Sequence, residues 1–404
     1  MNNLSKTKQI LSGLFQVALD AVDGCYVVEQ ALERIPVEGN VAVVAIGKAA
    51  CAMMLGAQNQ LKDQIQSALV ITKLGHGDKL LNWPCIESGH PIPDEMSLNA
   101  GANLLEFIEN IPKDTGFLAL ISGGASALVE VLPNNIDLDK LQKVNEYLLG
   151  SGLTINEMNQ VRQSLSLIKG GKALNYLSQN KITQFLISDV KGNLPDIIGS
   201  GLFVSEQENN EQLDISKLPE WLRDLMQPKE HVSSRVMTES HIVASNELAC
   251  EAIIHKAKEL GYTVTYHGQT LYGDVYEKAD SLAIDLINAE SGIHIWGGET
   301  TIVLPKVVGR GGRNQSLALA LACKLENKSG ITALVGATDG GDGSTEDAGA
   351  IIDGFTLQRG GENACDYLSA ADAGTYLAEA GDLISTGPTG TNVMDIVIAL
   401  KEQL

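Results

Sequence analysis

The sequence predicts an α/β fold, and three observations support this prediction. Short apolar runs of strand length recur along the chain, and segments with the apolar spacing of a helix separate them. Glycine is abundant, at 41 of the 404 residues, whereas aromatic residues make up only 4%. This composition is typical of glycine-rich turns between strands and helices and not of β-sandwiches. Because strands that alternate with helices form βαβ units, a parallel sheet is expected.

The first half of the chain opens with an amphipathic helix over residues 10–22, where apolar residues follow a helical period. Uninterrupted apolar runs come next, and such runs are typical of strands buried on both faces of a parallel sheet. We expect these strands at residues 41–46, 68–72, 117–121 and 184–188. Helices are expected between them at residues 98–111 and 156–168.

A polar stretch without periodicity interrupts this alternation at residues 205–213, and two prolines follow within residues 217–234. The chain, at 404 residues, is also longer than the roughly 250–300 residues at which a single core stops growing. We therefore predict two domains, residues 1–236 and residues 237–404.

Strands and helices alternate again in the second half of the chain, which predicts a second α/β domain. Strands are expected at residues 241–244, 263–267, 293–296, 331–336 and 393–400, with a further strand-like run at 300–304. Helices are expected at residues 246–260, at 279–289 and in the apolar run 317–325, with the last of these starting at Asn314.

The acidic composition limits the class of partner. The formal net charge is −21, and binding to nucleic acid needs a basic surface, so nucleic acid is not an expected partner. The six cysteines are scattered and form no CxxC pair, which is typical of a reduced cytosolic protein. No signal-peptide pattern opens the chain, and no window approaches the roughly 18 apolar residues of a membrane span. We expect a cytoplasmic protein without membrane contact.

Residues 309–315 combine three glycines with two arginines, directly before the predicted helix. Glycines let the backbone approach a ligand closely, and arginines offer a planar fork of donors that fits phosphate or carboxylate. The free N–H groups of a helix that starts at Asn314 would point to the same place. This segment therefore predicts an anion site that uses Arg310, Arg313 and Asn314.

Two further candidates follow buried strands of the first half, at the sheet edge where open α/β sheets bind ligands. Lys48 follows the strand at 41–46 and starts a helix, although a solvated lysine at that place is an equally good interpretation. Gly123, Gly124 and Ser126 follow the strand at 117–121 and predict a nest of N–H groups for an anion. The structural alternative is a tight turn whose glycines only permit close packing.

Acidic residues at strand ends are the third kind of candidate. Asp189 follows the strand at 184–188, and Asp339 follows the strand at 331–336 in a loop rich in glycine and acids. Either carboxylate would suit Mg²⁺ or would accept a proton from a hydroxyl group. The structural alternatives are a turn cap for Asp189 and a solvated acidic loop for Asp339. Glu299 lies in a turn after the strand at 293–296 and is a candidate for ligand binding or only a turn residue.

Taken together, these motifs resemble the glycerate 2-kinase family, sometimes labelled hydroxypyruvate reductase. The matching segments occur in family order at residues 46–49, 88–95, 122–128, 161–162 with 168–172, 297–300, 309–315, 337–343 and 386–392. The resemblance implies a Rossmann-like three-layer N-terminal domain, a smaller α/β C-terminal domain of MOFRL type, and an active site in the cleft between them.

By that resemblance the chain would use ATP and Mg²⁺ to phosphorylate the 2-hydroxyl of D-glycerate, giving 2-phosphoglycerate. The family's catalytic lysine and arginine map onto Lys48 and Arg313, and Asp189 is expected to act with them. Asp189 and Asp339 are expected to hold the metal or to orient the hydroxyl group. We expect substrate or nucleotide binding by Gly123, Gly124, Ser126, Arg310, Asn314 and Glu299.

Other functions stay open at this point. The chain departs from the family pattern at residues 192–194 and 200–203, which leaves a kinase for a related small 2-hydroxy acid as an alternative. An NAD(P)-dependent hydroxypyruvate reductase would need a GxGxxG turn after a strand, and neither half supplies one. A non-enzymatic anion-binding module would bind the ligand without turning over ATP.

Overall fold

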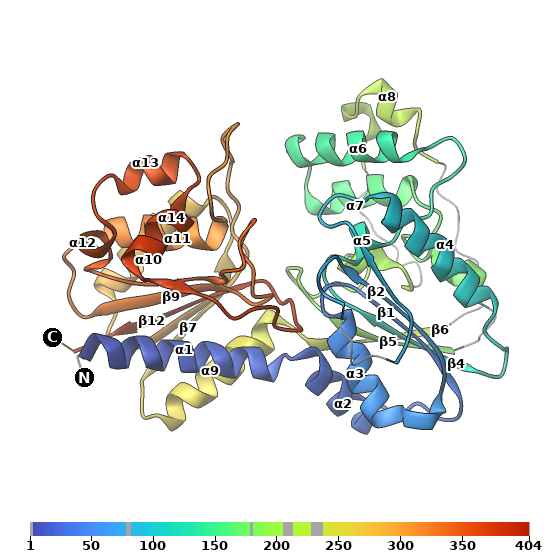
Figure 1. Ribbon diagram of the computed structural model, residues 1–404, viewed down its shortest axis with the longest axis horizontal. Coiled ribbons are helices and arrows are strands. Elements are labelled where there is room, and N and C mark those ends of the chain that lie inside the picture. The colour runs from blue at the N-terminus through green and yellow to red at the C-terminus, as the bar shows by residue number, and fades with distance from the viewer. Residues whose placement is uncertain (1–2, 78–81, 178–180, 205–212, 228–236, 404) are drawn as a thin grey trace. The chain divides into compact units, whose positions relative to one another are not determined.

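The computed structural model describes the whole chain except residues 1–2, 78–81, 178–180, 205–212, 228–236 and 404. The chain divides into two compact units. Gly24–Val243 form what we call the N-terminal unit, and Met1–Asp23 with Ala244–Leu404 form the C-terminal unit. Each unit has its own six-stranded sheet with helices against it (Figure 1). The predicted fold class, with two α/β parts, is confirmed.

The sheet of the N-terminal unit has the strand order β3-β2-β1-β4-β5-β6. Its strands are β1 (Val41–Ile46), β2 (Ile65–Lys73), β3 (Cys85–Ser88), β4 (Gly116–Ile121), β5 (Lys181–Ile187) and β6 (Met237–Ala244). The pairings from β3 through β5 are all parallel. Every residue of β1 is buried, as expected for a central strand covered on both faces. The order 3-2-1-4-5-6 is that of a Rossmann fold, which confirms the Rossmann-like expectation.

Helices surround this sheet and close its core. They are α2 (Gly24–Arg34), α3 (Ala50–Leu61), α4 (Glu95–Glu109), α5 (Ala125–Leu128), α6 (Leu138–Gly150), α7 (Ile155–Ser164) and α8 (Glu220–Arg223). The core under α4 contains the apolar side chains of β1, β2 and β4, with the rings of Phe117 and Phe203 packed edge to face. Sequence periodicity located α4 well, and its start is set by Asp94, whose carboxylate accepts from the Ser97 amide.

The sheet of the C-terminal unit is mixed and has the order β11-β10-β9-β12-β8-β7. Its strands are β7 (Val264–Leu271), β8 (Gly292–Gly298), β9 (Ile331–Ala337), β10 (Gly349–Asp353), β11 (Leu383–Ile384) and β12 (Asp395–Lys401). Only β7 and β8 pair in parallel, and the other pairings are antiparallel. The expectation of a parallel sheet therefore holds for the N-terminal unit and is wrong for this one.

Helices cover both faces of the second sheet (Figure 1). They are α1 (Asn3–Ala21), α9 (Asn246–Glu259), α10 (Val275–Asn288), α11 (Arg313–Lys324), α12 (Thr356–Gly360), α13 (Ala364–Ser369) and α14 (Ala373–Ala380). α1 packs against α9 and reaches β9 and β12. Phe15 of α1 lies so close to Gly336 of β9 that a side chain at Gly336 would meet its ring.

These units differ in two ways from the division at residues 236 and 237. α1 belongs to the C-terminal unit, because its buried face packs on that unit's sheet, and β6 pairs within the N-terminal sheet.

The strand-like run at 300–304 is not a strand beyond an isolated bridge at Thr301. Ile302 of that run packs against the core of the C-terminal unit, but Val303 is 86% exposed and Leu304 is also exposed.

Within the ranges that the structure describes, no single helix has the length and apolar composition needed to cross a membrane. Residues 6–21 and 24–34 meet those criteria only as a bent pair.

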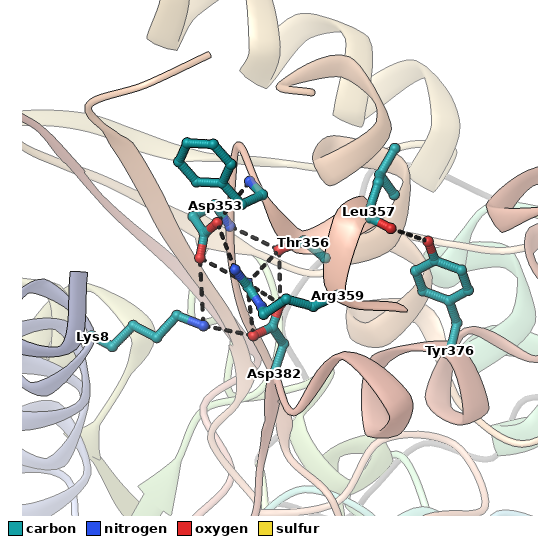
Figure 2. Close-up of polar contacts among 8 residues, drawn as sticks. Lys8, Asp353, Thr356, Leu357, Arg359, Tyr376 and Asp382 are labelled. Atoms are coloured by element: carbon teal, nitrogen blue, oxygen red, sulfur yellow. Dashed lines mark hydrogen bonds and ion pairs between the residues drawn. The ribbon is translucent and has the colours of Figure 1, made fainter. Parts of the chain in front are cut away.

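A buried ionic network ties α1 to the C-terminal unit (Figure 2). Lys8 of α1 donates to the Asp382 carboxylate at 2.6 Å, and Arg359 donates to Asp382 at 2.7 Å and to Asp353 at 2.8 Å. Asp382 and Asp353 are almost fully buried. Burial acts to raise the pKa of Asp353, but hydrogen bonds from Arg359 and the Phe355 amide outweigh it and lower that pKa. The network therefore favours the charged form of Asp353 inside the unit.

Replacing Asp382 with alanine should lower the free energy of unfolding by about 3 kcal/mol, because two cations lose a buried partner. Chemical denaturation followed by circular dichroism measures this. Asp366→Ala is the matched control, since Asp366 lies exposed on α13. Equal destabilisation by the two variants would contradict the anchoring role of the network.

Candidate active site

The strand order of the N-terminal sheet reverses direction between β1 and β4, because the chain builds β2 and β3 on one side of β1 and β4 onward on the other. In open α/β sheets, ligands bind outside the carboxyl ends of the strands at such a switch point. Gly47 and Lys48 follow β1 here, and Ser122, Gly123 and Gly124 follow β4. The fold therefore brings two of the predicted motifs to one place.

The backbone positions Lys48 by close packing at this switch point. Gly47 has φ of +133°, and any side chain there would overlap the Ser122 hydroxyl. The Lys48 amide donates to the Gly123 carbonyl at 2.9 Å, and the Ala49 amide donates to Ser122 Oγ at 3.1 Å. Only glycine combines this φ with so little space, so Gly47 fixes the start of the turn that carries Lys48.

Gly124 lies between two polar side chains of the same unit. Its φ is +87°, and a Cβ added to it would lie 3.0 Å from His90 Cδ2 and 3.3 Å from Lys48 Cγ. Lys48 and His90 thus flank the Gly124 backbone. The sequence alone does not indicate that His90 lies here, because the spacing of 34 residues to Gly124 carries no local signal.

The predicted nest at Gly123, Gly124 and Ser126 is only partly available. The Ala125 amide donates to the Ser122 carbonyl, and the Ala127 amide donates to the Gly124 carbonyl. The Ser126 hydroxyl bonds the Ser200 hydroxyl at 2.8 Å. The turn therefore satisfies two of its own N–H groups, and the Ser126 side chain is bonded to Ser200.

A pocket of about 210 Å³ opens beside this turn within the N-terminal unit. Gly124, Ser126 and His90 line it together with the buried ion pair of Lys169 and Glu130 and with Arg162 of α7. Arg162 lies in one of the segments that resemble the family, but sequence reasoning assigned it no role. Asp189 follows β5 in the same unit and is half-buried.

The second group of candidates lies in the C-terminal unit around Arg313, the first residue of α11. Arg313 donates to Asp395 from Nε at 2.8 Å and from Nη2 at 3.3 Å, and its Nη1 lies 2.6 Å from Glu299 Oε1. Burial acts to lower the pKa of Arg313, but the charges of Asp395 and Glu299 outweigh it and raise the pKa. The guanidinium is thus held charged and in one orientation. Asp395, which opens β12, was not among the predicted site residues.

The N-terminus of α11 is occupied by a carboxylate of the chain itself. Asp342 accepts from the Asn314 amide at 3.1 Å and from the Gln315 amide at 2.8 Å. Burial raises the pKa of Asp342 to about 6 in spite of these two hydrogen bonds. The N–H groups at Asn314 that the sequence assigned to a ligand anion therefore already have an anionic partner.

Arg310 is also paired, donating from Nη2 to Asp347 at 2.7 Å, and its amide donates to Asp372 at 2.8 Å. Asp339 follows β9, and its carboxylate accepts from the Gly341 amide at 3.3 Å. Among the described residues, no group of three or more His, Cys, Asp or Glu side chains has an arrangement that would hold a metal ion. The two predicted metal ligands, Asp189 and Asp339, belong to different units.

The raised pKa of Asp342 makes the stability of the C-terminal unit depend on pH. The pKa of the Asp342 carboxyl is about 6 in the folded state, whereas the ordinary value is 3.8. The group therefore holds its proton more tightly when the chain is folded. The free energy of unfolding should therefore fall as the pH rises from about 4 to about 6. Asp342→Asn removes this group and should flatten that part of the profile, as measured by denaturation at fixed pH values. The exposed control Asp366→Asn should keep the slope, and an unchanged slope in Asp342→Asn would refute the assignment.

Two known families match different parts of the chain. Residues 10–227 match a family described as a domain of unknown function, DUF4147, and residues 292–395 match the MOFRL family. The chain is 33% identical to the D-glycerate 2-kinase of Thermotoga maritima over 97% of its own length and 98% of the relative's. It is 35% identical to an Agrobacterium vitis protein whose name provisionally gives hydroxypyruvate reductase, over 96% of this chain and 93% of the relative.

A solved structure is similar over the same extent. The crystal structure of glycerate kinase from Thermotoga maritima matches with a TM-score of 0.83 and 31% identity, covering 98% of this chain and all of that one. Both the sequence match and the structural match extend across the two units. The chain therefore belongs to the glycerate 2-kinase family.

Proposed function

We propose that this chain transfers the γ-phosphoryl group of ATP to the 2-hydroxyl of D-glycerate and so forms 2-phosphoglycerate. The observation that carries the proposal is the similarity, over nearly the whole of both chains, to a protein named D-glycerate 2-kinase. Fold alone would not suffice, because one fold serves many chemistries. The arrangement of residues at the switch point adds independent support.

Phosphoryl transfer needs positioning and positive charge more than covalent help from the protein. Lys48 supplies a cation at the carboxyl end of β1, where the Gly47 turn fixes its backbone. We assign to Lys48 the stabilisation of negative charge on the transferred group. His90 and Ser126 border the same turn and present polar side chains to the bound acid.

Arg313 is the second cation in the proposal. Its bidentate pair with Asp395 and its contact with Glu299 hold the guanidinium rigidly, so a bound anion would meet a preorganised charge. We expect Arg310 to assist from the exposed side of the same segment. That the residues of the two units act on one pair of substrates is an expectation from the family resemblance and stays a prediction.

Mg²⁺ belongs to the proposal only as the counter-ion of ATP. The described residues form no dedicated metal cage, and Asp189 and Asp339 each carry a carboxylate that suits weak contacts to a hydrated ion. Such an ion would neutralise charge on the phosphates. We assign no step of the reaction to it and retain Asp189 as a candidate for orienting the attacking hydroxyl group.

A cytoplasmic location is proposed from the scattered cysteines alone.

A related 2-hydroxy acid is the second candidate substrate, and one feature favours keeping it. The chain departs from the family pattern at residues 200–203, and Ser200 is the residue that bonds Ser126 in the turn. The Ser200 and Gly201 carbonyls also accept from the Gly170 and Gly171 amides. A changed loop at this place would alter the pocket in which the acid binds.

The reductase alternative lacks a GxGxxG turn after β1 or β4.

The proposal predicts release of ADP from ATP that depends on D-glycerate, with 2-phosphoglycerate as the product. A coupled ADP assay over D-glycerate, tartronate, lactate and tartrate measures the preference, and phosphorus NMR identifies the phosphorylated carbon. D-glycerate should have the highest kcat/KM of the four acids. A parallel assay follows NADH absorbance with hydroxypyruvate. Oxidation of NADH without acid-dependent ADP release would overturn the kinase assignment in favour of the reductase.

A further inference from the structure

Arg162 is a cation without a counter-charge among the described residues, in a pocket where Lys169 is paired with Glu130. It lies in the last turn of α7 and lines the pocket of about 210 Å³ beside Gly124 and Ser126. Among the residues that the structure describes, no hydrogen bond or ion pair engages the Arg162 guanidinium. Its side chain is half-buried, and this burial lowers its pKa. A desolvated guanidinium without a partner is costly and therefore calls for a ligand.

The charge balance of the pocket singles out this residue. Lys169 is 2% exposed and is paired with Glu130, which is 1% exposed, so these two charges cancel. Arg162 adds a positive charge to the pocket lining that no carboxylate among the described lining residues offsets. This local charge stands out in a chain whose formal net charge is −21.

The position of Arg162 is fixed from both ends of α7. Thr154 and Glu157 form a capping box at its start, and Lys172 donates from Nζ to the Gln163 carbonyl near its end at 2.8 Å. Asn159 lies one turn before Arg162 on the same helix face, and it accepts from the Ser200 hydroxyl at 3.4 Å. Because Ser200 in turn bonds Ser126, α7 presents Arg162 on the face that is joined to the turn after β4.

The size of the pocket indicates what it holds. Its volume of about 210 Å³ is below the roughly 300–1,000 Å³ of pockets that enclose drug-sized ligands, which favours a small ligand over a whole nucleotide. Apolar side chains of Leu141, Val144 and Leu165 form part of its wall. A small acid fits this combination, with its carboxylate on the cation and its carbon chain against the wall.

We propose that Arg162 binds the carboxylate of the substrate, so that this pocket is the subsite that selects a short-chain hydroxy acid over neutral polyols. The inference rests on the proposed function for the identity of the acid. Arg162 offers two parallel N–H donors to the two carboxylate oxygens. Ser126 borders the same pocket and donates to Ser200, because the Ser200 proton goes to Asn159. The hydroxyl group to be phosphorylated then lies beyond the carboxylate, toward the turn that carries Lys48.

The test compares Arg162→Gln and Arg162→Lys with the wild type, using D-glycerate and its neutral amide, glyceramide. Arg162→Gln should raise KM for D-glycerate by about 10- to 150-fold, the range of a charge-assisted hydrogen bond, and leave KM for ATP unchanged. Arg162→Lys keeps the charge without the fork and should fall between the two. The preference for D-glycerate over glyceramide should collapse in Arg162→Gln. Arg223→Gln on α8, an exposed arginine of the same unit, is the matched control and should behave as the wild type.

If Arg162 has a purely structural role, its replacement should raise KM equally for D-glycerate and glyceramide and preserve the preference between them. That result would overturn the subsite. A raised KM for ATP with unchanged KM for D-glycerate also overturns it. Calorimetric binding of D-glycerate without ATP separates this proposal from the proposed function. If the wild type binds D-glycerate but releases no ADP, and Arg162→Gln abolishes this binding, the subsite is supported and the kinase assignment is overturned. If ADP release depends on D-glycerate and Arg162→Gln keeps the preference for D-glycerate over glyceramide, the kinase assignment is supported and the subsite is overturned. If the wild type neither binds nor phosphorylates D-glycerate, both proposals are overturned.

Discussion

The reversal of strand order between β1 and β4 is the constraint on which the rest of the N-terminal unit depends. It opens the sheet at the carboxyl ends of two adjacent buried strands, and the turns after those strands meet there. The Gly47 turn packs on Ser122 so closely that no side chain fits between them. Lys48, His90 and the Arg162 pocket are all positioned around this one contact between backbones.

Charge is arranged differently in the two units. In the C-terminal unit, Arg313 and Arg310 are held by Asp395, Glu299 and Asp347, so that unit presents cations whose orientation is set by the chain's own carboxylates. In the pocket of the N-terminal unit, Arg162 has no such partner among the described residues, whereas Lys169 does. A cation that is oriented and neutralised by carboxylates, such as Arg313, suits the stabilisation of negative charge that develops only in a transition state. A cation without a counter-charge, such as Arg162, suits the binding of a substrate that carries a permanent negative charge.

Much of the fold was predictable because buried parallel strands such as β1 and β4 are uninterrupted apolar runs, and glycine-rich turns mark their ends. β10 and β11 escaped prediction because β11 has only two residues and β10 follows an acidic loop. The run at 300–304 looked like a strand by composition but has no neighbouring strand with which to form a ladder. Site residues at strand ends were predictable by rule, whereas the partnership of Arg313 with Asp395 joins residues 82 positions apart and leaves no local signal. Arg162 looks like any helical arginine until the pocket around it is seen.

The most direct test of this account is the kcat/KM for D-glycerate of Gly124→Ala beside that of Gly152→Ala. Both glycines have positive φ, at +87° and +71°, so alanine imposes a similar backbone penalty at each. Only at Gly124 does the new Cβ crowd His90 and Lys48, since nothing lies within 4 Å of a Cβ at Gly152. The account predicts a loss of about 100-fold for Gly124→Ala, with circular dichroism unchanged, and little loss for Gly152→Ala. Equal activity in the two variants would contradict the placement of the reaction at the β1–β4 switch point.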